Sequence, residues 1–174
     1  MAILPILVAP DPRLKLKAQS VDKVDAAVRR LMDDMLETMY AAPGIGLAAP
    51  QVGVEQRVIV MDVARDDEPR APLFMANPQI TWVSDEDATY EEGCLSVPEH
   101  YADVVRPAAI KVRFLDHDNE LREIDVSGLL ATVIQHEMDH LDGVLFIDHL
   151  SSLKRNMILR KLVKSKRQVL EAAS

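Results

Sequence analysis

Five consecutive residues, His136-Glu137-Met138-Asp139-His140, carry the clearest chemical signal in this chain of 174 residues. In a helix, side chains four positions apart lie on one face, so His136 and His140 can share a metal ion. Glu137 then lies beside any water that the metal holds. A divalent ion with an open position lowers the pKa of its water to roughly 7, and a carboxylate can relay the proton. The pentapeptide therefore indicates metal-assisted hydrolysis, unless it is only the solvated face of a helix.

The residues before this motif predict a helix over 128–142. Leu129 and Val133 precede the two histidines at helical spacing, so the histidines continue an apolar face. Gly143 suits the end of the helix because glycine tolerates the left-handed backbone conformation. We therefore expect a largely buried helix that presents both imidazoles on one side.

A catalytic metal needs a third protein ligand. The metzincin pattern would place a histidine where this chain has Phe146, so that pattern fails. Cys94 is the only cysteine and cannot form an intramolecular disulfide, although an isolated cysteine is often just a small buried residue. It follows Gly93, which permits close backbone approach. One thiolate and two imidazoles would leave a tetrahedral fourth position for water.

A third segment, Gly44-Ile45-Gly46-Leu47-Ala48-Ala49-Pro50-Gln51, joins two glycines to small apolar residues and an amide. The glycines alone are compatible with an ordinary turn between a helix and a strand. Gln51 adds chemistry, because an uncharged amide can aim its N–H at a developing oxyanion without competing for the metal.

These three segments together resemble the signature motifs of the bacterial peptide deformylases. The matching stretches are GIGLAAPQ at 44–51, EGCLS at 92–96 and QHEMDHLDG at 135–143, in the same order and at similar intervals. The resemblance extends through the whole chain and implies a single deformylase-like domain over 1–174. Enzymes of this family remove the N-formyl group from the first methionine of nascent polypeptides. The resemblance thus implies a metal-dependent amide hydrolase that releases formate from N-formylmethionyl peptides.

The resemblance also implies a role for each matching residue. Three residues would bind the metal: Cys94, His136 and His140. Glu137 would be the general base and then the general acid. The Gln51 side chain and the Leu95 backbone N–H would hold the formyl oxygen as it becomes tetrahedral. Fe²⁺ is the metal that the resemblance favours, while Zn²⁺, Ni²⁺ and Co²⁺ also suit these ligands.

Substrate contacts follow from the same resemblance. Backbone groups near Ile45, Gly46 and Gly93 would pair with an extended peptide, which reads no side chains and suits many nascent chains. A methionine pocket must be apolar, and the helix offers Leu129 and Val133 for it, unless these two are plain core residues.

Two positions depart from the family's pattern. Tyr101 stands where some members have an arginine, and His149 stands where an arginine is frequent, so the family's substrate anchoring cannot be carried over at these positions, whereas its metal ligands can. Two rival functions are a metallopeptidase and a non-catalytic metal-binding module. A metallopeptidase would share the helix but lacks its downstream ligand here, and a non-catalytic metal module would need a fourth protein ligand, which no second cysteine supplies.

The elements that must position these residues predict an α+β fold. Helices are expected near 22–41, 128–142 and 151–170. Strands are expected at 58–61, 73–75, 80–83, 110–114 and 121–124, with a loop at 64–72. Because the strands are grouped between helices, we expect largely antiparallel sheets around a central metal-binding helix, with an N-terminal and a C-terminal helix.

Composition and charge limit the classes of partner that this chain is expected to bind. With 48% apolar residues and no apolar run of membrane-spanning length, the chain predicts a cytoplasmic enzyme that binds neither membrane nor DNA. Residues 151–174 hold seven basic side chains and one acidic, a net charge of +6, whereas residues 1–150 carry −14. This basic C-terminal helix and tail is either a solvated face or a handle for the ribosome near its exit site.

Overall fold

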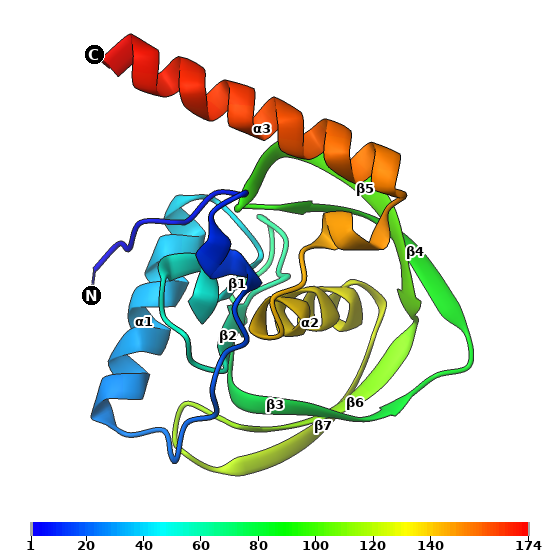
Figure 1. Cartoon of the computed structure of the whole chain (residues 1–174). Coiled ribbons are helices and arrows are strands. Elements are labelled where there is room, and N and C mark those ends of the chain that lie inside the picture. Colours follow the sequence, from blue (N-terminus) through cyan, green and yellow to red (C-terminus); the bar gives the residue numbers. More distant parts are fainter. Residues whose placement is uncertain (1, 174) are drawn as a thin grey trace.

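The computed structural model describes residues 2–173 and has the predicted α+β architecture, with sheets and two flanking helices around helix α2 (Figure 1). The α-helices are α1 (Ala26–Ala41), α2 (Gly128–Leu141) and α3 (Ser152–Ala173). Short 3-10 helices are η1 (Pro12–Lys15), η2 (Ala49–Val52) and η3 (Phe146–His149). The strands are β1 (Gly46–Ala48), β2 (Val58–Met61), β3 (Leu73–Val83), β4 (Asp87–Cys94), β5 (Val97–Pro107), β6 (Ala109–Leu115) and β7 (Leu121–Ser127).

All strand pairs within the two sheets are antiparallel. One sheet has five strands in the order β1-β2-β3-β6-β7, and β4 and β5 form a separate hairpin. A two-residue turn, Leu95 and Ser96, joins the two strands of this hairpin. Strand β1 lies at the edge of the larger sheet, so one side of its backbone remains open for pairing.

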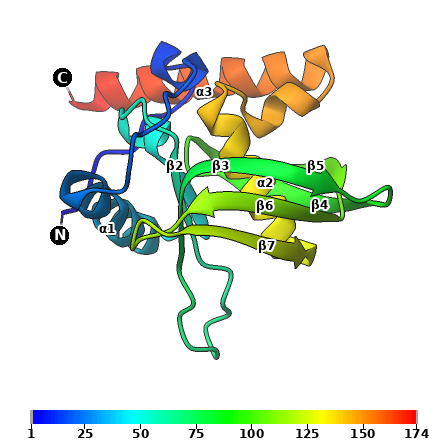
Figure 2. The same cartoon turned by 90° about the horizontal axis from the view of Figure 1, so that it is seen from below.

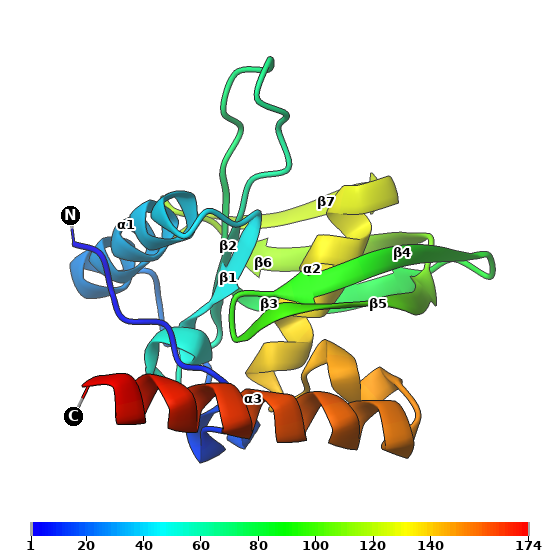
Figure 3. The same ribbon diagram turned by 90° about the horizontal axis from the view of Figure 1, so that it is seen from above.

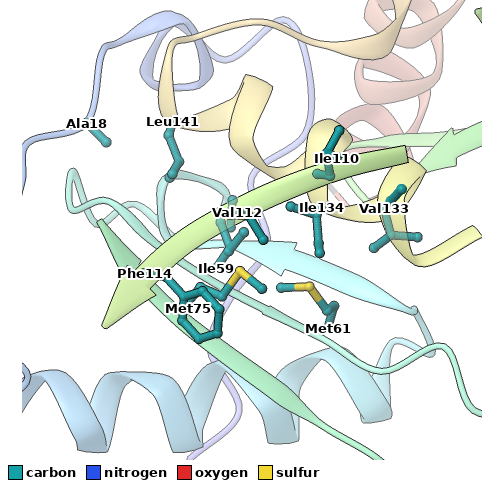
Figure 4. Close-up of a cluster of buried hydrophobic side chains, with 12 residues drawn as sticks. Ala18, Ile59, Met61, Met75, Ile110, Val112, Phe114, Val133, Ile134 and Leu141 are labelled. Atoms are coloured by element: carbon teal, nitrogen blue, oxygen red, sulfur yellow. The ribbon is translucent and has the colours of Figure 1, made fainter. Parts of the chain in front are cut away.

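Helix α2 lies between the larger sheet and the β4–β5 hairpin, and it confirms the predicted helix over 128–142. Its apolar side chains Val133 and Ile134 point toward Ile59 and Met61 of strand β2 (Figure 4). Gly143 ends the helix with φ of 74°, the left-handed conformation expected there. Burial of this face fixes the direction in which the two histidines point.

Helix α1 begins four residues later than predicted. Asp25 caps it by accepting a hydrogen bond from the Val28 N–H at 2.9 Å. The N–H of Val24 instead donates to the side chain of Asn119 at 2.8 Å, which holds this residue outside the helix. Val24 fits the helical spacing of the apolar residues that follow, so the predicted helix began before Asp25, which caps the helix in the structure.

The strand predictions were correct in place but incomplete. The expected strands 73–75 and 80–83 are one strand, β3, which continues through an irregularity at Asn77, where φ is 50°. Strands β1, β4 and β5 were not predicted. Strands β4 and β5 are rich in charged residues and expose much of their surface, so they lack the apolar alternation that marks β6 and β7.

Helix α3 crosses the outside of the molecule (Figure 1). Ile158, Leu159 and Leu162 contact a core cluster that includes Phe146. Leu153, near the start of the helix, is 71% exposed and does not belong to this packed side. Among residues 2–173, no helix has the length and apolar character needed to cross a membrane.

The loop between β2 and β3 confirms the predicted loop at 64–72. It projects from the body of the molecule as a long excursion beside β1 and β2 (Figures 2 and 3). Residues 66–71 in this loop are exposed.

Candidate metal centre and active site

Cys94, His136 and His140 come together although 42 positions separate the cysteine from the first histidine. Strand β4 ends at Cys94, and helix α2 supplies both histidines. Their ligand atoms lie within 4.8 Å of one another, and the Cys94 Sγ is 3.3 Å from His140 Nε2. Both histidines are buried. One sulfur and two imidazole nitrogens converging on one point form the donor set of a transition-metal site.

A buried network orients His136. Its Nδ1 is 2.9 Å from Glu92 Oε1, so Nε2 is left to face the cysteine side of the site. Arg106 holds the same carboxylate with two hydrogen bonds of 2.7 and 2.9 Å and reaches Asp139 at 2.8 Å. Such outer partners fix the ring orientation of a metal-binding histidine. The network therefore ties β4, β5 and α2 to one ligand.

Sequence reasoning missed Glu92 and Arg106 as functional residues. Glu92 belongs to the EGCLS segment and could have been found there. Arg106 gives no local signal, because only the pairing of β4 with β5 brings it beside Glu92. A buried arginine on a strand becomes informative once its carboxylate partners are known.

The electrostatic surroundings of the two histidines would suit a cation. Burial opposes ionisation of His136, but the Glu137 carboxylate and the Cys94 sulfur outweigh it and raise the pKa of His136 well above its ordinary value. Burial and the neighbouring His136 lower the pKa of His140. The carboxylates of Glu137 and Glu92 around this imidazole thus favour a positive charge here, which a metal ion would supply in place of a proton.

Glu137 is fully enclosed beside the ligands. Its Oε2 is 4.0 Å from His136 Nε2, and its buried Oε1 has no hydrogen-bond partner among the described residues. Burial raises the pKa of Glu137 to about 7. The carboxylate lies directly over Gly46, where any Cβ would overlap it. The second glycine of the GIG segment is therefore needed to leave room for this acid.

Gln51 is buried in η2 with its amide orientation fixed. Its Oε1 accepts a hydrogen bond from the Ala48 N–H at 2.9 Å, which turns Nε2 toward the metal side. Nε2 is 3.1 Å from Ser96 Oγ and 3.5 Å from Cys94 Sγ. A donor held at this place could serve a developing oxyanion, and that role stays a prediction. The Leu95 amide lies in the adjacent turn.

A cavity of about 720 Å³ opens beside these groups. The predicted residues that line it are Ile45, Gly46, Gln51, Gly93, Cys94, Leu95, Leu129, Val133, His136 and Glu137. Leu129 is half-exposed and belongs to the rim of the cavity, whereas Val133 is buried and belongs to its floor. Tyr101 lies at the rim with its ring against Gly93. His149 does not line the cavity and contacts Asp139 at 2.9 Å.

The edge strand β1 offers backbone groups to this cavity. The Ile45 carbonyl already accepts a hydrogen bond from the Asp62 N–H at 2.9 Å, so it is not free for a ligand. In an antiparallel pair, neighbouring residues direct their polar groups to opposite sides. Gly46, which is opposite Met61, therefore directs its N–H and C=O away from β2.

Comparisons with known proteins agree with this geometry. The sequence profile of the polypeptide deformylase family matches residues 3–156. The peptide deformylase of Phenylobacterium zucineum is 62% identical over 164 residues, covering 94% of this chain and 97% of that protein. That of Agrobacterium fabrum is 53% identical, covering 96% and 98%.

Solved structures show the same relationship. The crystal structure of peptide deformylase from Ehrlichia chaffeensis has a TM-score of 0.93 and 42% identity, with 97% of this chain and 99% of that chain covered. A second structure of that enzyme, in complex with actinonin, has a TM-score of 0.92 and 43% identity, with coverage of 96% and 99%. The profile match, the relatives and the shared fold place this chain in the polypeptide deformylase family.

Proposed function

We propose that this chain removes the N-formyl group from formylmethionine at the start of nascent polypeptides, releasing formate and a free amine. Members of the family are metal-dependent enzymes with this activity. The observation that carries the proposal is the convergence of Cys94, His136 and His140 beside the buried acid Glu137, inside a cavity of about 720 Å³.

The residues present fit a divalent metal. Cys94 Sγ and one nitrogen of each histidine would hold it, and Glu92 would keep His136 in the required orientation. When bound, the metal lowers the pKa of a coordinated water to roughly 7 and polarises the carbonyl under attack. The unpartnered, buried Glu137 Oε1 supports an additional group at this place, because buried carboxylate oxygens rarely lack partners.

Glu137 would move the proton. Because burial brings the pKa of Glu137 to about 7, its carboxylate can take a proton from the attacking water near neutral pH. The same group then donates that proton to the nitrogen of the leaving peptide amine. The Gln51 Nε2–H and the Leu95 N–H would hold the formyl oxygen as negative charge develops on it.

An extended substrate would pair with two backbone edges of the cavity. Gly46 of β1 directs its polar groups to the open side, and Gly93 lies near the end of β4 on the hairpin that bounds the cavity. Leu129 and Val133 would contact the methionine side chain. Ile45 would contribute its exposed side chain, since its carbonyl is already used.

Formate release tests the function directly. The purified, metal-loaded protein should release formate from formyl-Met-Ala-Ser, with acetyl-Met-Ala-Ser as the unformylated control. A metallopeptidase would instead cleave internal amide bonds of an unformylated peptide. Peptide cleavage without formate release would favour that rival.

We propose Fe²⁺ as the native metal, with Zn²⁺, Ni²⁺ or Co²⁺ as alternatives that imidazole and thiolate also accept. Anaerobic purification should yield protein whose iron content and formate release rise together across fractions, measured by elemental analysis and assay. A strictly zinc-loaded sample is expected to be less active. Full activity of that zinc form would contradict the assignment.

The C-terminal helix is proposed to bring the enzyme to the ribosome in the cytoplasm, near the point where nascent chains emerge. The predicted single domain over 1–174 ends in this basic helix and tail, 151–174. Its charge of +6 contrasts with −14 elsewhere, and a basic surface suits RNA. Because Leu162 is buried against the core, truncation near Leu150 would disturb the fold and is a poor test.

Charge replacement is the better test of ribosome binding. The side chains to replace by Gln are exposed: Arg160, Lys161, Lys164 and Lys166. We expect normal formate release from a short peptide, weaker co-sedimentation with ribosomes and a flatter dependence of binding on salt, because fewer counterions are released. Unchanged co-sedimentation of the folded variant at two salt concentrations would rule out this role.

A further inference from the structure

Asp62, which directly follows strand β2, joins three parts of the chain outside the metal centre. Its Oδ2 accepts hydrogen bonds from Tyr40 Oη at 2.5 Å and from the Ala71 N–H at 3.1 Å. Its Oδ1 accepts one from the Ala64 N–H at 2.9 Å. The two ends of the projecting loop are thus tied to each other and to the last turn of helix α1. We call these four residues the Asp62 junction.

The same residue also holds the backbone that leads into β1. The Asp62 N–H donates to the Ile45 carbonyl at 2.9 Å, and the Gly44 N–H donates to the Met39 carbonyl at 2.8 Å, one residue before Tyr40. The segment Gly44–Gly46 is therefore held by helix α1 at Gly44 and by the Asp62 junction at Ile45. This segment borders the cavity.

The junction is built from well-satisfied groups in a largely buried place. The Asp62 residue is only 6% exposed, and its carboxylate has partners on both oxygens. Burial and the neighbouring carboxylate raise the pKa of Tyr40 to about 12, so the phenol remains a donor. The Arg70 guanidinium lies 4.1 Å from the centre of the Tyr40 ring and covers it.

We propose that Asp62 and Tyr40 are positioning residues that hold the Gly44–Gly46 backbone at the angle needed to pair with an extended peptide substrate. This inference rests on the proposed function and deepens it. Neither side chain lines the cavity, so each acts through the Ile45 carbonyl and the register of β1. Among the described residues, the three-residue strand β1 pairs with β2 alone, so its position depends on such anchors.

The proposal predicts a defect in peptide binding and not in chemistry. Tyr40→Phe removes one donor to Asp62 but keeps the ring beneath Arg70, and Asp62→Asn keeps the shape but replaces one acceptor oxygen by an NH2 group, which cannot accept a hydrogen bond. For formyl-Met-Ala-Ser we expect KM to rise about tenfold with kcat within about threefold, the pattern of lost ground-state binding. For formylmethionine amide, which is too short to pair along β1, KM should change much less.

Hydrogen exchange of the backbone provides an independent measurement. Peptides covering 44–48 should exchange faster in both variants, while peptides covering α2 should not change. Asp67→Asn is the matched control, because Asp67 lies at the exposed tip of the same loop. It should match the unmodified protein in kinetics and exchange. If Asp62→Asn does not fold, Tyr40→Phe decides alone.

Three results would overturn the inference. The first is an unchanged KM for formyl-Met-Ala-Ser in folded Tyr40→Phe. The second is an equal loss for the long and the short substrate, and the third is a loss of metal together with kcat, since either would indicate general damage to the site. Absence of formate release by the unmodified protein would instead refute the proposed function itself.

Discussion

Replacing Glu137 by Gln is expected to lower kcat by roughly 10²–10⁴-fold, the usual contribution of a general acid and base. Glutamine keeps the shape of the side chain above Gly46 but cannot accept a proton from water. Because Glu137 is not one of the three residues proposed to bind the metal, the variant should retain the metal. The measurement is formate release from formyl-Met-Ala-Ser beside elemental analysis of the same sample.

A second comparison tests whether the position of the carboxylate matters as well as its proton. Gly46→Ala adds a Cβ that would overlap Glu137 Oε2, so the acid must shift while its charge is retained. The melting temperature and metal content of each variant serve as controls.

Turnover of Glu137→Gln within a few-fold of the unmodified protein, at full metal content, would show that this mechanism is wrong.

The sequence predicted the α+β fold because its central helix and several strands are strongly patterned. Helix α2 was placed almost to the residue, since its apolar face is continuous and Gly143 marks its end. The hairpin of β4 and β5 was missed because its strands carry many charges and are half exposed. Propensity alone does not show a strand whose stability comes from pairing and from packing on one face.

The three residues proposed to bind the metal could be found from the sequence for a different reason. His136 and His140 are neighbours through helical spacing, which is a local property. Cys94 was joined to them as the one thiol available and through the EGCLS segment, and its sulfur lies 3.3 Å from His140 Nε2. Arg106 and Asp62 act through contacts distant in sequence, so no spacing pattern could reveal them.

Comparing Cys94→Ala with Glu92→Gln distinguishes the loss of a proposed metal ligand from the loss of a residue that orients one. Cys94→Ala deletes one of three donors and the only anionic one, so the variant should lose tight metal binding and nearly all turnover. Glu92→Gln retains an oxygen that can accept from His136 Nδ1 but loses the charge that Arg106 holds. Outer partners of this kind contribute roughly 10–100-fold to metal affinity or activity.

The two variants should therefore differ when metal is supplied in excess. Added metal should restore most of the turnover of Glu92→Gln, because all three donors remain and only the orientation of His136 is weakened. It should not restore Cys94→Ala to the same level, since two imidazoles alone hold a catalytic metal poorly. Metal titration followed by the formate assay gives both quantities. Full metal occupancy of Cys94→Ala after dialysis would remove Cys94 from the ligand set, and the proposed site would then need another third donor.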